Sequence, residues 1–514
     1  MTSKGSEDKT ARGGLPPMPE TVLLARPAIK IDWKRIAFMF LGIALFLAIY
    51  FAPGFSDAID PGGKHFPLSP QGKASLALFA LAGTWWVFEV VPIGVTSILI
   101  GVVQALFLIR KPADAFKDFM DPSVWFILGS LVIGMVFTKT GLTKRMAYKM
   151  LAIVGEKTSM ILLGCFIMTV ILTHIMAHTA VAATVFPLFM AINSLYEESE
   201  KPTRFGKNLF MGMAFVAGAG SIITLLGAAR GAVAIGFFNQ MADKEIGFFE
   251  LTYYMFPVGW LMMFLIWGLM MLFYPPEKKT IPGLRERVKV LYSRLGPLSK
   301  NEILVLVIVF SAIAILALKS LFPRVELFKN LDKSGIILAA TVIFFALKIL
   351  KLEDLEELPL NIILLFGGAM SIGFCLWQTG AAEWMAVKFI VMFQTAPWFV
   401  FVLAITFFVM LLTNFIMNVA AIAITLPVAL VLAKYLGVAQ EVIFFSSLVA
   451  AGMPFLLLVG AAPNAIAYGS GQFTSGEFFK AGIIPSILLM VVVALFIWIV
   501  WPLMGMPVTA PLAP

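Results

Sequence analysis

The chain has 514 residues, of which 60% are hydrophobic and 13% are charged, about half the charged fraction of an ordinary soluble protein. This composition excludes a soluble globular protein of this length. The net charge of +9 does not indicate a nucleic-acid partner, because the lysines and arginines gather in a few loops between apolar runs, as in membrane proteins.

The chain opens with a polar segment and continues as a series of apolar runs. Residues 1–35 are polar, basic and Pro-containing, and we predict a disordered cytoplasmic tail without a cleavable signal peptide. The runs that follow are about 17 to 25 residues long, enough to cross a hydrocarbon core of about 30 Å. We predict about eleven crossings, which begin near Ile36, Ser75, Ile93, Ser123, Asn208, Thr252, Ile303, Gly335, Asn361, Val442 and Gly482.

Two further apolar stretches, Thr158–Leu195 and Ala396–Ala433, have polar residues at their middle. Each is either a pair of crossings or a hairpin that enters and leaves the membrane on one side. Loop charge does not decide between them, because both alternatives give the same parity. With the N-terminus inside, the basic loops fall on the cytoplasmic side and the C-terminal tail, 504–514, falls outside.

The sequence repeats itself. The segment Gly227–Gly236 matches Gly460–Gly469 at six of ten positions. Upstream, Thr173, His178 and Pro187 match Thr413, Asn418 and Pro427 at an offset of 240 (413 − 173, 418 − 178, 427 − 187), and a third block matches at 239. Ordered blocks at nearly one offset indicate two related halves. The predicted loop positions make these halves inverted relative to each other. The basic segment 276–302 joins them, either as a short interfacial helix or as a solvated linker.

Interrupted apolar segments at matching positions of two halves are the strongest sequence indication of a transporter binding site. This chain has two hairpin tips, 177–179 and 417–419, and two helix breaks, at Gly227–Gly231 and Gly460–Asn464. Helix N-termini exposed at such points favour anions, whereas the carbonyl ends favour cations. One site can therefore hold an anion and a coupling cation together.

Several motifs resemble those of a known family. These are Trp85-Trp86-Val-Phe-Glu89-Val-Val-Pro92, Phe366-Gly367-Gly368, the two Pro-terminated hairpins and the Gly-Ala-Ala-Pro-Asn break at 460–464. The chain resembles, over almost its whole length, the divalent anion:sodium symporters of the ion transporter superfamily. The resemblance implies an all-α fold of eleven crossings and two re-entrant hairpins, a homodimer, and an elevator motion.

The resemblance also implies a division of the chain. Scaffold segments would be 36–157 and 303–394, and transport segments would be 158–275 and 395–503, with the tail 1–35, the linker 276–302 and the tail 504–514 outside both. The protein would be a multi-pass protein of a bacterial-type inner membrane.

The family signature at each hairpin tip is Ser-Asn-Thr, and this chain departs from it with Ala-His-Thr at 177–179 and Met-Asn-Val at 417–419. By correspondence, the predicted substrate-binding residues are His178, Thr179, Arg230, Asn418, Val419, Pro463 and Asn464. The candidates for coupling to a cation are Thr173, Ala177, Gly227, Thr413, Asn418 and Ala461. Sodium is the only cofactor that this pattern suggests.

Arg230 and His178 stand where the family uses small or amide side chains. An arginine at membrane depth is costly and usually functional, and its five donors suit a carboxylate or a sulfate. It could replace lost hydroxyl donors or a lost sodium ion, or it could instead pair with an acidic group or extend to one face. His178 could bind substrate or carry a proton, or it could be a hydrogen-bonded packing residue.

The sequence thus predicts a secondary active transporter of small divalent anions, either C4 dicarboxylates or sulfate. Sodium symport, proton coupling through His178 and anion exchange remain open. A passive channel is the weaker alternative, because no crossing carries a continuous polar face. A membrane-embedded enzyme or receptor is also weaker, because no metal-spaced cluster, nucleophile–base pair or phosphate loop occurs in the sequence.

Overall fold

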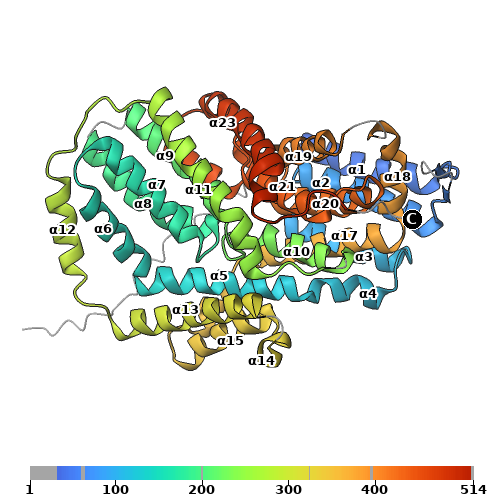
Figure 1. Cartoon of the computed structure of the whole chain (residues 1–514), viewed down its shortest axis with the longest axis horizontal. Coiled ribbons are helices and arrows are strands. Elements are labelled where there is room, and N and C mark those ends of the chain that lie inside the picture. Colours follow the sequence, from blue (N-terminus) through green and yellow to red (C-terminus); the bar gives the residue numbers. More distant parts are fainter. Residues whose placement is uncertain are drawn as a thin grey trace, which may run out of the picture.

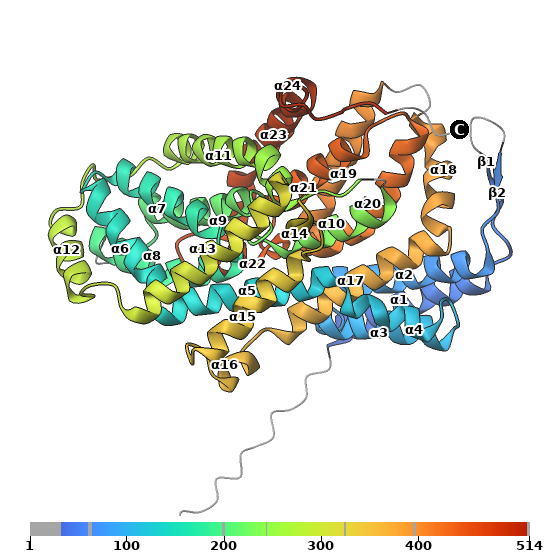
Figure 2. The same ribbon diagram turned by 60° about the horizontal axis from the view of Figure 1, so that its bottom comes forward.

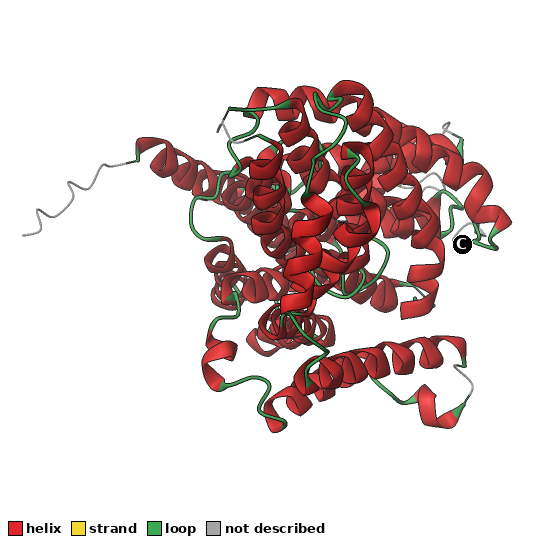
Figure 3. Cartoon of the chain, turned by 90° about the vertical axis from the view of Figure 1, so that its left-hand side faces the viewer, coloured by secondary structure: helices red, strands yellow, loops and turns green. Residues whose placement is uncertain are grey.

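The computed structural model describes residues 32–59, 64–197, 201–242, 244–322, 325–393 and 397–510, and nearly every element in them is a helix (Figures 1 and 3). A two-residue antiparallel strand pair, β1 (Ala58–Ile59) with β2 (His65–Phe66), interrupts this pattern. The all-helical prediction is confirmed. Most of the predicted N-terminal tail, and the last four residues of the C-terminal tail, lie outside the described residues.

The described elements follow one another in two series that are joined by α12 (Leu284–Arg294). The first series is α1 (Trp33–Phe51), α2 (Pro70–Val87), α3 (Ile93–Leu106), α4 (Pro112–Lys117), the 3-10 turn η1 (Asp118–Met120), α5 (Pro122–Thr140), α6 (Leu142–Val154), α7 (Thr158–Thr173), α8 (His178–Tyr196), α9 (Arg204–Ser221), α10 (Ala229–Met241) and α11 (Phe248–Phe273). The second series is α13 (Lys300–Leu321), α14 (Glu326–Lys329), α15 (Lys333–Ala346), α16 (Leu352–Glu356), α17 (Leu360–Gln378), α18 (Ala381–Phe393), α19 (Trp398–Phe415), α20 (Asn418–Tyr435), α21 (Gln440–Gly452), the 3-10 turn η2 (Leu458–Gly460), α22 (Ala462–Tyr468), α23 (Ser475–Leu495), the π-helical turn η3 (Phe496–Val500) and α24 (Trp501–Leu503).

The helices are long and apolar enough for a membrane protein. Within the described part of the chain, nine helices of at least 18 residues could cross a bilayer by length and composition. The most apolar are α13, with a mean hydropathy of 2.7, and the continuous helix 475–503, with 3.0. The helices α3, α7, α15 and α21 are shorter but also apolar. The predicted total of eleven crossings depends on how these shorter helices lie in the bilayer and stays a prediction.

Helices from both series pack together in space. Figures 1 and 2 show α6, α7, α8 and α12 at one end, α1, α2, α17 and α18 at the other, and α11, α21 and α23 between them. The two stretches predicted as hairpins are helical hairpins, α7 with α8 and α19 with α20, and in each pair the two helices contact each other. Whether they are re-entrant stays a prediction.

Two helices are interrupted, as predicted, but the interruptions start earlier. The first lies between Ser221 and Ala229, and the second between Gly452 and Ala462. Pro463 does not break a helix here. It occupies the first turn of α22, where a proline costs nothing because its missing N–H would have no intrahelical partner. Arg230 likewise lies in the first turn of α10 rather than in the break itself.

The sequence repeat reappears in the backbone conformation. Leu108 and Lys348, which follow α3 and α15, both have a positive φ, of 50° and 56°, and lie 240 residues apart (348 − 108). Gly141 and Gly380 have φ values of 84° and 77° and lie 239 residues apart (380 − 141). These are the offsets of the sequence blocks, and a positive φ is uncommon for leucine and lysine. The two series therefore share local backbone geometry as well as residues.

The linker contains the helix α12, and whether that helix lies at the membrane interface stays a prediction. Just before it, the chain pairs with the junction between α6 and α7. Ile281 N–H donates to the Glu156 carbonyl at 2.9 Å, and Thr158 N–H donates to the Lys279 carbonyl at 3.0 Å. Gly155 and Gly283, one in each of these neighbouring segments, both have a positive φ, of 77° and 75°. Two chain connections thus run side by side at this junction.

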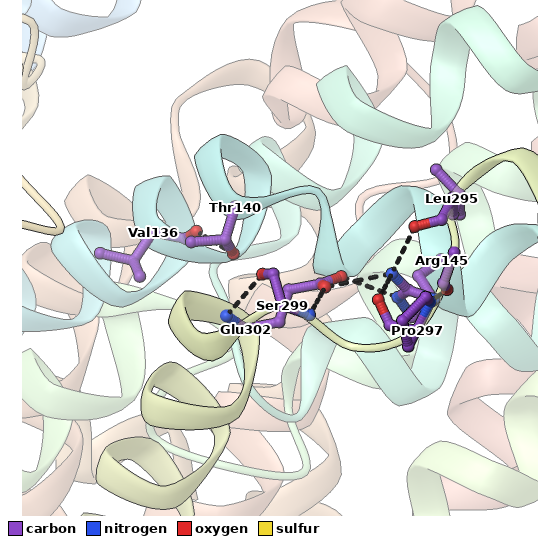
Figure 4. Close-up of polar contacts among 8 residues, drawn as sticks. Val136, Thr140, Arg145, Leu295, Pro297, Ser299 and Glu302 are labelled. Carbon is purple, nitrogen blue, oxygen red and sulfur yellow. Dashed lines mark hydrogen bonds and ion pairs between the residues drawn. The ribbon is translucent and has the colours of Figure 1, made fainter.

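The other end of the linker is fixed by the ion pair of Arg145 on α6 with Glu302 on α13 (Figure 4). Arg145 Nε and Nη2 donate to the two carboxylate oxygens at 2.7 and 3.1 Å, which is the bidentate geometry that makes such pairs strong. Glu302 also accepts from the Ser299 N–H at 2.7 Å and so completes the capping box of α13. The start of α13 is therefore held against α6.

Candidate functional site

The two hairpin tips meet at one cavity of about 750 Å³. One wall comes from α5 and from the segment that joins α16 to α17, and the other comes from the first residues of α8, α10 and α20. Its polar lining residues are Ser130, Thr138, Lys139, His178, Thr179, Thr184, Asp354, Glu357 and Asn418. The tips were predicted from positions 240 residues apart (418 − 178), and the fold brings them together.

The tips present two helix N-termini to the cavity. Ala177 and Met417, both cavity-lining, hold the N-cap positions of α8 and α20 with almost the same backbone angles, φ −57° in each and ψ 135° and 139°. The first N–H groups of a helix have no intrahelical acceptor. One of them is used here, because His178 N–H donates to the Gly227 carbonyl at 2.9 Å. Among the residues that the structure describes, no acceptor is found for the other N–H groups at these two N-termini, so a ligand can use them.

Four predicted substrate-binding residues line the cavity: His178, Thr179, Asn418 and Val419. His178 is 9% exposed, and its Nδ1 has no hydrogen-bond partner among the described residues. Asn418 and Val419 are nearly buried, at 6% and 3% exposure. A neutral amide, a hydroxyl and an imidazole thus border the two helix N-termini.

Three predicted substrate-binding residues lie elsewhere. The cavity lining includes Ala228 and Ala229 but not Arg230, whose Nη2 donates to Ser221 Oγ at 2.7 Å. Pro463 and Asn464 lie in the first turn of α22, and Asn464 Nδ2 donates to the Pro454 and Leu457 carbonyls at 2.9 and 3.1 Å across the second break. Direct contact of these three with substrate stays a prediction.

The cation-coupling candidates lie where each hairpin meets a helix break. A Cβ at Gly227 would lie 2.6 Å from the Thr173 carbonyl, and a Cβ at Gly460, next to Ala461, would lie 2.8 Å from the Thr413 carbonyl. Ala177 and Asn418 line the cavity. Carbonyl and hydroxyl oxygens are suitable ligands for a hard cation such as sodium. No group of three His, Cys, Asp or Glu side chains able to hold a metal ion occurs among the residues that the structure describes.

Sequence reasoning missed the charged residues of the cavity. Lys139, at the end of α5, forms an ion pair with Asp354 on α16, and Glu357 lines the cavity beside them. The two partners are 215 residues apart, so no local pattern could reveal the pair. The only available signal was a lysine close to the end of an apolar run.

We expect this ion pair to stabilise the protein in a pH-dependent way. The Lys139 ammonium beside Asp354 holds the pKa of that carboxyl below its ordinary value. A depressed pKa stabilises the fold above the unfolded-state pKa of about 3.9, and this contribution is lost as pH falls through the lower folded-state pKa. At pH 7 the Asp354→Asn variant should therefore melt at a lower temperature than the wild type, by a modest amount because Lys139 is partly exposed.

Thermal melting from pH 7 downward checks this expectation, and the two curves should merge only below about pH 4. Glu357→Gln is the matched control, because Glu357 forms no ion pair with a described residue and its loss should leave the melting temperature unchanged. A difference between Asp354→Asn and wild type that did not shrink as the pH fell below about 4 would contradict the assignment.

The family model for the "sodium:sulfate symporter transmembrane region" matches residues 35–507. The sodium-dependent dicarboxylate transporter SdcS of Staphylococcus saprophyticus is 25% identical over 464 residues, which cover 87% of this chain and 89% of the relative. SdcS of Staphylococcus aureus is 24% identical over 461 residues, covering 86% and 88%.

Two solved structures share the fold at low identity. MtrF of Neisseria gonorrhoeae, described within a class of antimetabolite efflux pumps, superposes with a TM-score of 0.56 at 14% identity and covers 93% of this chain and 96% of its own. The YdaH transporter of Alcanivorax borkumensis superposes with a TM-score of 0.54 at 14% identity and covers 93% and 99%. At this identity the likeness concerns the fold alone.

Proposed function

The chain belongs to the sodium:sulfate symporter family of membrane transporters, and from this premise we propose that it carries small divalent anions, C4 dicarboxylates first among them, across the membrane. The dicarboxylate assignment follows the two SdcS relatives, which are sodium-dependent dicarboxylate transporters. Sulfate is the other substrate that the family description suggests.

One observation carries the proposal: two helix N-termini, those of α8 and α20, border a single cavity. Unpaired N–H groups and the positive end of the helix dipole favour an anion at each end. Two such ends on one cavity suit a molecule with two negative groups. A volume of about 750 Å³ is in the range of small-molecule sites and accommodates a four-carbon diacid.

The transport cycle that we propose is an elevator motion in a homodimer of inverted halves. The hairpins and interrupted helices of segments 158–275 and 395–503 would move against the scaffold of segments 36–157 and 303–394. The matching backbone geometry after α3 and α15 supports two related halves, and inverted halves with a site at their interface are a common transporter design.

The cavity of this conformation faces the cytoplasm in the proposed orientation. Its charged lining residues Lys139, Asp354 and Glu357 lie at the end of α5 from which α6 continues. The helix α6 carries Lys144, Arg145 and Lys149, and such basic segments lie on the cytoplasmic side of membrane proteins. The N-terminus would then be cytoplasmic and the C-terminus external.

Ligand-induced stabilisation tests the proposed substrate. Succinate, malate, citrate and sulfate are added to the purified full-length protein, with and without sodium, and the melting temperature is recorded. We expect the largest increase with a C4 diacid. Uptake of labelled succinate into proteoliposomes then checks transport, and no movement of any anion by folded protein would refute the proposal.

The tip residues give a sharper expectation. Asn418→Leu and Thr179→Val keep the side-chain size but remove polar atoms that border the cavity. Loss of a hydrogen bond to a charged group costs about 1.5–3 kcal/mol, which is about 10- to 100-fold in affinity. Thr252→Val is the control, because the Thr252 hydroxyl donates to the Phe248 carbonyl within α11, away from the cavity. Binding that is unchanged in both tip variants would place the substrate elsewhere.

A further inference from the structure

A second cavity, of about 390 Å³, lies where the starts of α1, α3 and α17 meet. It is lined by Arg35 in the first turn of α1, by residues 89–93, which lead from α2 into α3, and by Asn361 in the first turn of α17. Asn361 Oδ1 accepts the Gly94 N–H at 2.8 Å, which ties α17 to α3. No lining residue of the cavity between the hairpin tips lines this one, so the two are separate.

One cation and one carboxylate line this second cavity without pairing with each other. Arg35 Nε donates to the Val90 carbonyl at 2.6 Å, and neither of its Nη groups has an acceptor among the described residues. In the same part of the chain, the Glu89 carboxylate accepts no hydrogen bond and forms no ion pair. The Ile93 N–H, at the first position of α3, likewise has no described acceptor. Arg35 and Ile93 therefore offer donors to an anion, and Glu89 offers an acceptor to a cation.

Glu89 is held in a strained backbone conformation at the wall of this cavity. Its φ is 44°, and a positive φ is uncommon for a residue other than glycine. The turn is fixed by Val90, whose N–H donates to the Trp85 carbonyl at 3.1 Å and whose carbonyl accepts from Arg35. Strain of this kind gathers at ligand sites. The turn thus keeps a carboxylate at a position where glycine would suit the backbone better.

The second cavity lies at the level of a membrane surface. Arg35 stands at the start of a candidate membrane span, which is the cytoplasmic end of α1 in the proposed orientation. Trp33, two residues earlier, is 72% exposed, and tryptophan is enriched at the lipid–water interface. Only 11% of the apolar stretch of α1 is buried, so most of this helix is open to lipid. The stacked rings of Phe38 and Phe88, with centroids 3.7 Å apart, continue this apolar surface up to Glu89.

We propose that the second cavity binds a membrane lipid whose headgroup carries a phosphate and a primary ammonium, as in phosphatidylethanolamine. The phosphate accepts from the Arg35 Nη groups and from the Ile93 N–H, the ammonium donates to the Glu89 carboxylate, and the acyl chains lie along α1. The volume of about 390 Å³ is within the range of small-molecule sites. The bound lipid would join the starts of α1, α3 and α17.

The pairing of charges selects this headgroup over other common ones. A phosphatidylglycerol headgroup has no cation for Glu89, so the carboxylate would be left beside a second negative charge. A phosphatidylcholine headgroup has a cation, but its quaternary nitrogen has no N–H to donate. Only the primary ammonium supplies both the charge and the hydrogen bonds that a carboxylate accepts. The inference does not depend on which anion the protein carries.

Melting of the purified full-length protein in detergent, titrated with defined lipids, tests the headgroup chemistry. Phosphatidylethanolamine should reach half of its stabilising effect at a concentration at least about tenfold lower than phosphatidylcholine or phosphatidylglycerol with the same acyl chains. Equal effects of these lipids, or a preference for phosphatidylglycerol, would overturn the proposal. Soluble glycerophosphoethanolamine has the headgroup without acyl chains and should stabilise far less. Equal potency of this soluble compound would overturn the assignment to a membrane lipid.

Substitution of the two charged residues tests their roles separately. Glu89→Gln should abolish the preference for phosphatidylethanolamine over phosphatidylcholine, because the amide carries no charge. Arg35→Gln should weaken the effect of every lipid about tenfold or more, because all of them carry the phosphate. The matched controls are Glu353→Gln on α16 and Arg287→Gln on α12, both exposed, which should behave like the wild type.

Glu89→Gly separates a role in ligand binding from a role in the fold. Glycine adopts a positive φ without strain, so without lipid this variant should melt at no lower a temperature than the wild type. It should nevertheless lose the preference for phosphatidylethanolamine. A lower melting temperature without lipid would mean that the carboxylate serves the fold, and an unchanged lipid preference in either Glu89 variant would mean that it does not contact the headgroup. Both results would overturn the proposal, and the Glu89 variants decide it if Arg35→Gln does not fold.

Discussion

Replacement of Gly227 by alanine is expected to lower transport by about 10- to 100-fold, because the added methyl group would meet three backbone atoms. The new Cβ would lie 2.6 Å from the Thr173 carbonyl oxygen, 2.7 Å from the Ser221 carbonyl oxygen and 2.9 Å from the Ser221 Cα. Backbone cannot rotate away as a side chain can, and overpacking of this kind costs about 1–3 kcal/mol.

The clash would act on the site as well as on stability. The Gly227 carbonyl accepts the His178 N–H at the start of α8, so a displaced Gly227 moves the first hairpin tip relative to the cavity. Melting temperature and succinate uptake should therefore both fall. Gly268→Ala is the control, because Gly268 lies in the helix α11 and the new Cβ would meet no described atom within 4 Å apart from its own helix backbone. Normal uptake by Gly227→Ala would show that α7 and the first break are not packed as described.

Substitution of Asn464 by leucine is expected to destabilise the second helix break more than any substitution on the surface. Asn464 is 2% exposed, and its Nδ2 donates to the Pro454 and Leu457 carbonyls. Leucine is of similar size but offers no donor, so both carbonyls would lose this partner inside the protein. Each unsatisfied buried group costs about 1–3 kcal/mol.

Thermal melting of the purified variant measures this loss, and uptake at a temperature below its melting point shows whether the break also matters for transport. Asn301→Leu, at the exposed start of α13, gives the same chemical change on the surface and should leave the melting temperature unchanged. An Asn464→Leu variant as stable as the wild type would mean that the two carbonyls find other partners.

The sequence was sufficient for the fold class and for the long apolar helices, because apolar runs are local features, but it did not predict the shorter helices α6 and α18. The stretch predicted from Thr158 to Leu195 corresponds to α7 and α8, and the stretch from Ala396 to Ala433 corresponds to α19 and α20. The repeat offsets also identified the two tips that share a cavity. The sequence-predicted starts differ by a few residues because helix caps such as Thr203 add a turn before the apolar run.

The direction of individual side chains could not be predicted in this way. Arg230 follows two cavity-lining alanines, yet its guanidinium points to Ser221 and Gly452, on helices whose packing no sequence pattern describes. The Lys139–Asp354 pair joins α5 to α16 through the tertiary fold alone. Family correspondence likewise identified Asn464 as a site residue, whereas the structure gives it hydrogen bonds across a helix break.

The paired connections between α6, α7 and the linker restrict how those parts can move. A single flexible connection would let the helix that follows it reorient in any direction. Here two connecting segments, one through Gly155 and one through Gly283, are joined by the backbone hydrogen bonds of Ile281 and Thr158. Two linked segments form a hinge, which allows rotation about one axis and resists rotation about the others. Such a hinge would confine the movement of α7 and α8 relative to α6 to rotation about one axis. It would also return the two helices to the same position after each movement.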